Sequence, residues 1–418
     1  MKPLDSAAAE RQPSLVSGAG LEERISETGR ELGEVLNATL DLLPEGRLGP
    51  QILARALSID KVLASRLLKA ARAGDPMAVA YHAPGPEPLR RFFRSARKRG
   101  VDAALAARAG AAVDAFESLI RRDIGDRSAL DAMISAWLPE AREVFELRRK
   151  QSAFRAMSEL KGMSADLNLG TVLLHPAKED DRLDVVWVVG LLGVRRLRAG
   201  VTVKLTSRRM PGEDAARHPQ TLDGRPIEDA AALDDLRLDA FCDRRPAPLE
   251  VRRAGDVNQY LLAGEDFGPR SAVDLILGEA NFSEMSRVVP AGSGRRGYVF
   301  AEIGTPCKAL QFDVLVHDEV YPGQSPRLDI YDTVLDGVAS VNDPSRDIDR
   351  LDLSESFADL GRGTTTLRSP DAPHYLELVQ HVFERTGWDA QAFRAFRCRA
   401  EYPVYGAQLV ASFQPPEA

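Results

Sequence analysis

The residues best suited to recognition chemistry lie at positions 50–72, where cations and hydrogen-bonding side chains recur among leucines at helical spacing. This spacing predicts two short helices, 50–57 and 61–72, joined by a tight turn. The second helix has two different faces. One face carries Leu63, Ala64, Leu67, Leu68 and Ala71, and the other carries Lys61, Val62, Ser65, Arg66 and Lys69.

The polar face of this second helix has the chemistry of a DNA-reading surface. A recognition helix places the side chains near its N-terminus against base edges in the major groove. Arg66 and Lys61 are suited to guanine O6 and N7 or to a phosphate, and Ser65 can hydrogen-bond to either. Val62 can touch a thymine methyl, and Gln51 is placed to meet a phosphate. The predicted DNA-binding residues are Gln51, Lys61, Val62, Ser65, Arg66 and Lys69.

The apolar residues of the segment fit the packing of a helix-turn-helix. Two helices that cross closely need a small residue inside the first one, and Ala54 supplies it. The turn position that is often glycine is Ser58 here, and Asp60 or Ser58 can cap the second helix. The shared core is expected to contain Leu53, Leu57, Ile59, Ala64 and Leu67.

The run Ala-Ser-Arg-Leu-Leu-Lys-Ala, positions 64–70, resembles the recognition helix of IclR-type winged-helix regulators. The resemblance covers residues 50–72 of the 418-residue chain. It implies sequence-specific binding to double-stranded DNA, usually as a homodimer. A two-stranded wing follows the recognition helix in such proteins, and the one candidate strand is 77–83.

Charge is distributed unevenly along a chain whose net charge is −7. Residues 47–100 hold twelve Lys or Arg and three Asp or Glu, which gives 12 − 3 = +9. Residues 328–360 hold two Arg and nine Asp or Glu, which gives 2 − 9 = −7. The basic block suits an anion such as DNA or an acidic partner, and the acidic stretch suits a cation, a nucleic-acid mimic or a solvated loop.

The surrounding sequence predicts an all-helical domain followed by a larger domain of a different kind. Residues 1–20 are rich in Ala, Ser, Gly and Pro and are expected to form a disordered tail. Helical periodicity extends over 21–162, in segments 21–43, 50–57, 61–72, 89–99, 101–122, 128–137 and 139–160.

Strand-like runs begin after residue 162. They lie at 171–175, 184–192, 201–206, 273–277, 298–303, 309–317, 393–401 and 405–413, with a helix at 375–386 and a loop-rich part near 207–240. Long helical crossovers are missing between most of these strands, so a mainly antiparallel arrangement is favoured. The predicted fold class is multidomain α+β, with domains 21–162 and 163–418.

Motifs for other chemistry are weak in this chain. Residues 292–297 match G-x-G-x-x-G, but a strand-like run follows where a dinucleotide site needs a helix, so a hairpin loop is expected. His317 lies beside Asp318 and Glu319, a fragment that fits a strand end better than a metal site. The three cysteines are far apart, which suits a reducing cytoplasm. No cofactor, metal or catalytic residue is predicted.

These observations favour a cytoplasmic, sequence-specific DNA-binding transcriptional regulator. Residues 163–418 would sense a small-molecule effector or mediate assembly. Two alternatives remain open at this stage: a protein–protein interaction module that does not bind DNA, and an enzyme with an unrecognised site in the α+β domain. The sequence has no apolar run of the roughly 20 residues that a membrane helix needs, so no membrane partner is expected.

Overall fold

The computed structural model describes residues 18–418, apart from 179–180, 210–218, 227–232, 244–248, 256 and 265. The chain divides into two compact units, Met1–Phe145 and Glu146–Ala418. The predicted α+β multidomain class is confirmed, since helices dominate up to Lys161 and strands dominate from Met163. The predicted N-terminal tail lies outside the described residues except for its last three positions, which begin the first helix.

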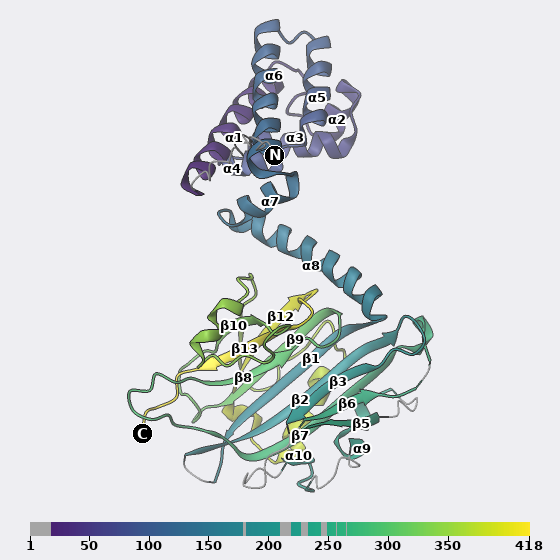
Figure 1. Cartoon of the computed structure of the whole chain (residues 1–418), viewed down its shortest axis with the longest axis vertical. Helices are drawn as coiled ribbons and strands as arrows, with labels where there is room; N and C mark the ends of the chain where they lie inside the picture. Colours follow the sequence, from purple (N-terminus) through teal and green to yellow (C-terminus); the bar gives the residue numbers. More distant parts are fainter. Residues whose placement is uncertain are drawn as a thin grey trace, which may run out of the picture. The chain divides into compact units, whose positions relative to one another are not determined.

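The first unit is a set of helices around one apolar core (Figure 1). A π-helical turn, Leu119–Ile124, extends α6. The last helix, α8, begins in this unit and continues into the second. The helices are α1 (Gly18–Asp41), α2 (Pro50–Leu57), α3 (Lys61–Arg72), α4 (Pro76–His82), α5 (Pro86–Lys98), α6 (Ala103–Ser118), α7 (Arg127–Ser135) and α8 (Pro139–Lys161).

Aspartates begin several of these helices by accepting hydrogen bonds from otherwise unpaired backbone N–H groups. Asp60 accepts from Leu63 N at the start of α3, and Asp102 accepts from Leu105 N at the start of α6. Asp126 caps α7, so this helix begins at Arg127. The predicted bounds 50–57 and 61–72 are confirmed: Pro50 occupies the first position of α2, and the Asp60 cap fixes the start of α3.

The candidate wing strand at 77–83 is wrong, because this segment is the helix α4. Asp75 caps the helix by accepting from Met77 N and Ala78 N, and Pro76 occupies its first position. The helix lies so close to α1 that a Cβ placed on Gly29 would be 1.9 Å from the carbonyl oxygen of Pro76. A short apolar run fits either a strand or a buried helix, and tertiary packing selects the helix here.

The second unit contains a large sheet and two small ones (Figure 1). In the part of the chain that the structure describes, the strand orders are β11-β12-β9-β1-β2-β7-β4, β10-β13-β8 and β3-β6-β5. The strands are β1 (Met163–Pro176), β2 (Arg182–Arg196), β3 (Val203–Arg209), β4 (Pro219–Gln220), β5 (Leu249–Ala254), β6 (Val257–Leu262), β7 (Val273–Ser286), β8 (Gly297–Glu302), β9 (Cys307–His317), β10 (Arg327–Asp332), β11 (Ala358–Arg362), β12 (Phe393–Glu401) and β13 (Ala407–Phe413).

The pairing is antiparallel except between β1 and β9, as the sequence predicted for most strands. The helix α10 (Tyr375–Thr386) packs on one face of the large sheet, and β8 and β13 pack on the other. Strands β5, β6, β10 and β11 were not predicted. The loop-rich part near 207–240 lies partly outside the described residues, and its described portion includes β4 and the short helix α9 (Leu233–Leu236).

A row of polar side chains crosses the large sheet beneath α10. Thr171 of β1 is in register with Asp313 of β9, which is in register with Arg397 of β12. The Arg397 guanidinium donates to both carboxylate oxygens of Asp313, at 2.8 and 2.7 Å. The Tyr375 hydroxyl donates to Asp313 at 2.6 Å and lies 2.9 Å from Thr171 Oγ1. The row therefore fixes α10 to three adjacent strands.

Replacing Arg397 with Met is expected to destabilise the second unit by about 3–5 kcal/mol, because the buried Asp313 loses its cationic partner. Arg399→Met is the control, since Arg399 pairs with Asp371 nearer the surface and its loss should cost at most about 1 kcal/mol. Urea-induced unfolding of the full chain measures both values. Equal small losses in the two variants would show that the Asp313 pair is not a structural anchor.

Candidate nucleic-acid interface

The turn between α2 and α3 has the backbone conformation that a glycine usually supplies. Ser58 ends α2 with φ 54° and ψ 44°, in the left-handed region. The backbone N–H of Ile59 then donates to Ala54 O at 3.0 Å, and Asp60 caps α3 at 2.7 Å from Leu63 N. Of the two capping residues that the sequence left open, Asp60 is the one that caps α3. Ser58 therefore adopts the left-handed conformation that this tight turn between α2 and α3 requires, although glycine more often occupies such a position.

Packing of α2 and α3 into the helical core determines which side chains face outward. The residues expected to form the shared core are all buried, and Leu67 is completely inaccessible. Because α3 buries one face along its whole length, its other face must point to solvent. The buried residues of the two helices and their turn are Leu53, Ala54, Leu57, Ile59, Leu63, Ala64, Leu67, Leu68, Ala70 and Ala71.

The predicted DNA-binding residues are all exposed, Gln51 on α2 and the other five on the solvent-facing side of α3. Val62 is 70% exposed. Ile52 of α2 is also exposed, at 44%. We name this exposed surface the α2–α3 face, and its members are Gln51, Ile52, Lys61, Val62, Ser65, Arg66 and Lys69.

Ion pairing separates the cations of the α2–α3 face from the arginines of α5. Arg90 pairs with Asp114 and Glu117, and Arg91 pairs with the carboxylate of the capping Asp60. Arg94 and Arg99 also have acidic partners, Glu87 and Glu45. By contrast, no ion pair joins Lys61, Arg66 or Lys69 to a carboxylate among the described residues. The +9 block is therefore partly neutralised on α5 and uncompensated on α3.

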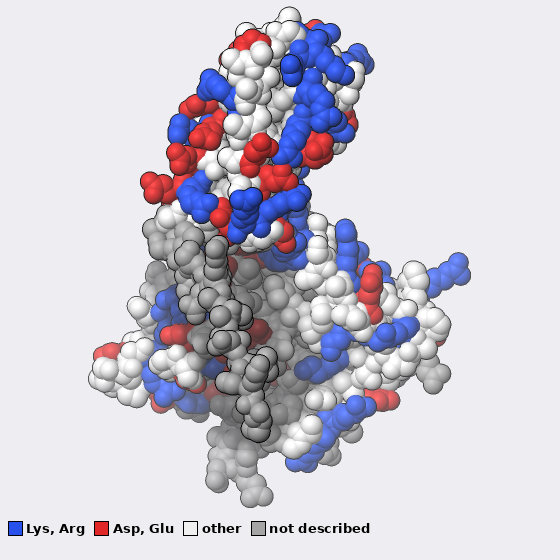
Figure 2. Space-filling view, turned by 45° about the horizontal axis from the view of Figure 1, so that its top comes forward, with Lys and Arg blue, Asp and Glu red and all other residues white. Residues whose placement is uncertain are grey.

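Lys and Arg side chains form a band along one side of the helical unit, on the side where Figure 1 places α5 (Figure 2). Near the C-terminal end of α4, one of these cations has a defined backbone partner. There Arg66 donates to the Ala83 carbonyl at 2.9 Å. Burial lowers the pKa of His82, and the nearby positive charges of Lys69 and Arg66 lower it further. The charge of Glu140 acts in the opposite direction, so the lowered pKa of His82 reflects burial first and the neighbouring cations second.

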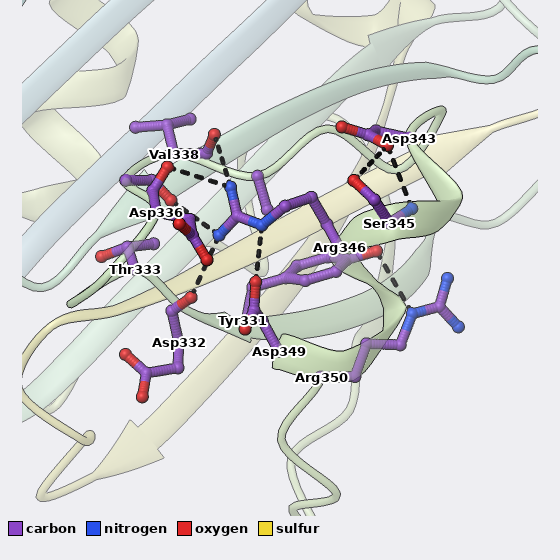
Figure 3. Close-up of polar contacts among 12 residues, drawn as sticks. Tyr331, Asp332, Thr333, Asp336, Val338, Asp343, Ser345, Arg346, Asp349 and Arg350 are labelled. Atoms are coloured by element: carbon purple, nitrogen blue, oxygen red, sulfur yellow. Dashed lines mark hydrogen bonds and ion pairs between the residues drawn. The ribbon is translucent and has the colours of Figure 1, made fainter.

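The acidic stretch at 329–359 surrounds a cation that belongs to the chain itself (Figure 3). Arg346 is 9% exposed, and its guanidinium donates to four backbone carbonyls and to the Asp349 carboxylate, the last at 2.6 Å. The carbonyl acceptors belong to Asp332, Asp336, Gly337 and Val338. Residues 332–349 of the segment are therefore ordered around an internal guanidinium, and the sequence showed only their negative charge.

The structure corrects one further prediction, the hairpin loop at residues 292–297. The glycine-rich run at 292–297 is not a hairpin loop, because it joins β7 of the large sheet to β8 of a different sheet.

An open hollow of about 640 Å³ lies in the helical unit, lined by Glu22, Glu23, Ser26, Glu27, Arg30, Asp75, Met77, Trp137 and Leu138. Within the described ranges, no cluster of His, Cys, Asp and Glu has the arrangement of a metal site.

A cluster of rings that the sequence did not predict lies where the parallel strands β1 and β9 end. His175 stacks on Trp388 with ring centroids 4.4 Å apart, and its ring lies 4.9 Å from that of His317. Its Nδ1 is 2.7 Å from the Pro176 carbonyl oxygen. Burial lowers the pKa of His175, and the neighbouring His317 lowers it further. The cluster is a packing feature that keeps His175 neutral.

Comparison of the chain with models of known families and with curated proteins gives no match. Among the helices of the described residues, none has both the length and the apolar character needed to cross a bilayer. The IclR resemblance therefore stays a prediction that rests on residues 50–72. The position expected for a wing strand holds α4, so the winged part of that resemblance does not extend past α3.

Ser58→Gly is expected to stabilise the helical unit by up to about 1 kcal/mol, because glycine adopts the left-handed conformation without the strain of a Cβ. Ser65→Gly provides the opposite control, since it places glycine inside α3 and should destabilise by about 0.5–1 kcal/mol. Thermal unfolding of both variants measures the difference. A loss of stability in Ser58→Gly would contradict the turn geometry.

The depressed pKa of His175 makes a prediction about pH. A histidine whose folded-state pKa lies below its unfolded value of about 6.5 adds stability above that pH, and this contribution is lost as pH falls. Replacing it with glutamine removes the titration. The difference in unfolding free energy between wild type and His175→Gln should therefore shrink from pH 8 to pH 5, measured by urea unfolding. A constant difference would show that burial does not perturb His175.

Proposed function

We propose that the chain is a sequence-specific DNA-binding transcriptional regulator that inserts α3 into the major groove of double-stranded DNA. One observation carries the proposal most directly. The leucines of α3 are buried in the core, so Lys61, Arg66 and Lys69 face solvent, and no carboxylate among the described residues neutralises them. An uncompensated cationic face on a helix that follows a tight turn suits a polyanion with a groove.

The contacts divide into those that position the protein and those that read sequence. Arg66 and Lys61 have the reach and charge for guanine O6 and N7, and Val62 offers a methyl contact to thymine. Gln51 and Lys69 flank them and suit phosphate oxygens. Affinity then comes mainly from phosphate neutralisation, which makes binding strongly dependent on salt.

The second unit takes the role of a sensing or assembly domain in this proposal. A small-molecule effector, a homodimeric state of the kind that IclR-type regulators adopt and a cytoplasmic location belong to the same proposal.

Protein binding is the second candidate function, and the exposed aliphatic side chains of the same surface favour it. Leu48, Ile52 and Val62 are 65%, 44% and 70% exposed and lie in or just before the α2–α3 segment. A purely phosphate-binding surface has no need of three such side chains. The two functions make different predictions, because protein binding does not require duplex DNA.

The test is binding of the purified full chain to a randomised duplex-DNA pool over a salt series, followed by sequencing of the bound fraction. Arg66→Ala should cost about 1–3 kcal/mol of binding free energy and relax the sequence preference. Lys69→Ala should weaken binding to all sequences and reduce the salt slope by about one. Together they separate base reading from phosphate contact.

Arg108→Ala is the matched control for these variants. Arg108 is an exposed arginine of α6 in the same unit, and its carboxylate partner Glu34 is 3.7 Å away. Its loss should leave DNA affinity within about twofold of wild type. If the folded chain fails to bind duplex DNA at low salt, or if Arg108→Ala weakens binding as much as Arg66→Ala, the DNA proposal is wrong.

A further inference from the structure

The Arg346 loop, defined here as residues 332–349, combines an ordered backbone with exposed aliphatic side chains. Leu335 is 91% exposed and Ile348 is 89% exposed, and Val334 and Val338 are 66% and 47% exposed. No other short segment in the described part of the chain gathers four large apolar side chains in this way. Aspartates surround them, so the loop is both acidic and apolar.

The backbone of this loop is held from several directions. Arg346 binds four of its carbonyls from inside, with the closest contact to Gly337 O at 2.9 Å (Figure 3). The buried amide of Gln408 both donates to Ala339 O at 3.1 Å and accepts from Ala339 N at 2.7 Å. Thr333 donates its hydroxyl to Gly406 O at 2.6 Å. The conformational entropy of the loop is therefore lost before anything binds to it.

An ordered loop that exposes its largest apolar side chains has the features of a surface that binds another protein. Exposed apolar groups contribute to binding when a partner removes them from water, and prior ordering lowers the entropic cost of association. The surrounding carboxylates add a requirement on the partner. Its surface must be aliphatic at the centre and cationic around it.

The α2–α3 face meets both requirements. It exposes Ile52 and Val62, with Leu48 adjacent in sequence, and it carries Lys61, Arg66 and Lys69 without carboxylate partners among the described residues. Five members of the face, together with the neighbouring Leu48, thus complement the aspartates and aliphatic side chains of the Arg346 loop. Both surfaces are present in every copy of the chain.

We propose that the Arg346 loop of one copy binds the α2–α3 face of a second copy. The contact joins two different surfaces, so it is heterologous and leaves one loop and one face free at the ends of a pair. The association itself does not depend on DNA binding. Its regulatory consequence does rest on the proposed function: the loop then competes with DNA for the same cations, and self-association masks the DNA-binding surface.

Sedimentation velocity of the full chain, without DNA, tests the contact over a concentration series at low and high salt. Wild type should associate with increasing concentration, and more weakly at high salt. A loop variant, Leu335→Ser with Asp336→Lys, and a face variant, Val62→Ser with Lys61→Glu, should each associate at least about tenfold more weakly. Leu197→Ser, which alters an exposed leucine outside both surfaces, should behave as wild type.

A mixture of the two variants separates a heterologous contact from any other. The face variant keeps an intact loop, and the loop variant keeps an intact face, so mixing them should restore association to near wild-type strength. A contact between two loops, between two faces or within one copy gains nothing from mixing. Because each substituted side chain is exposed, urea unfolding should show both variants to be as stable as wild type.

The proposal is overturned if wild type stays monomeric at every concentration at low salt, or if the stable variants fail to associate when mixed. Both outcomes leave the DNA proposal untouched, because no DNA is present. Adding a 20-base-pair duplex to associated wild type then tests the regulatory consequence. Competition predicts that the duplex dissociates the pairs, whereas joint binding of duplex and intact pairs would show that the loop does not cover the DNA-binding surface.

Discussion

Burial of the leucine face of α3 is the constraint on which the functional surface depends. A twelve-residue helix at the surface of a unit buries only one side in the core, and in α3 this side carries Leu63, Leu67 and Leu68. The capping Asp60 and the left-handed Ser58 fix where the helix starts and how it leaves α2. Because α3 packs its leucine face against the core, Lys61, Arg66 and Lys69 on its other face are exposed to solvent.

The helices of the first unit could be predicted from the sequence where the apolar periodicity and a capping residue indicate the same helix boundary. Positions 50–57 and 61–72 were predicted with the bounds that the structure has, because apolar spacing indicates both helices and Asp60 marks the start of the second. The segment 77–83 was misread because seven residues are too few to distinguish a strand from a helix that packs on Gly29. The polar row of Asp313 and Arg397 was not predicted, since its members meet only when β9 and β12 pair.

Charge counts from the sequence gave the correct signs but not the distribution of free charge. The basic block contains the arginines of α5, and several of these are neutralised by carboxylates from other parts of the unit. The acidic stretch contains Arg346, which organises the loop from within. Two small surfaces result. The α2–α3 face is cationic and the Arg346 loop is acidic, and both expose aliphatic side chains. Neither could be recognised until the ion pairs and exposures of single side chains were known.

Site-specific photo-crosslinking tests directly whether α3 touches DNA with its solvent-facing side. A photoreactive side chain replaces the exposed Ser65 in one protein and the exposed Arg108 of α6 in another. Each is irradiated with the randomised duplex pool at low salt. If α3 inserts into the groove, covalent protein–DNA adducts form from position 65 and none from position 108. Adducts from position 108 alone, or from neither position, would contradict this insertion.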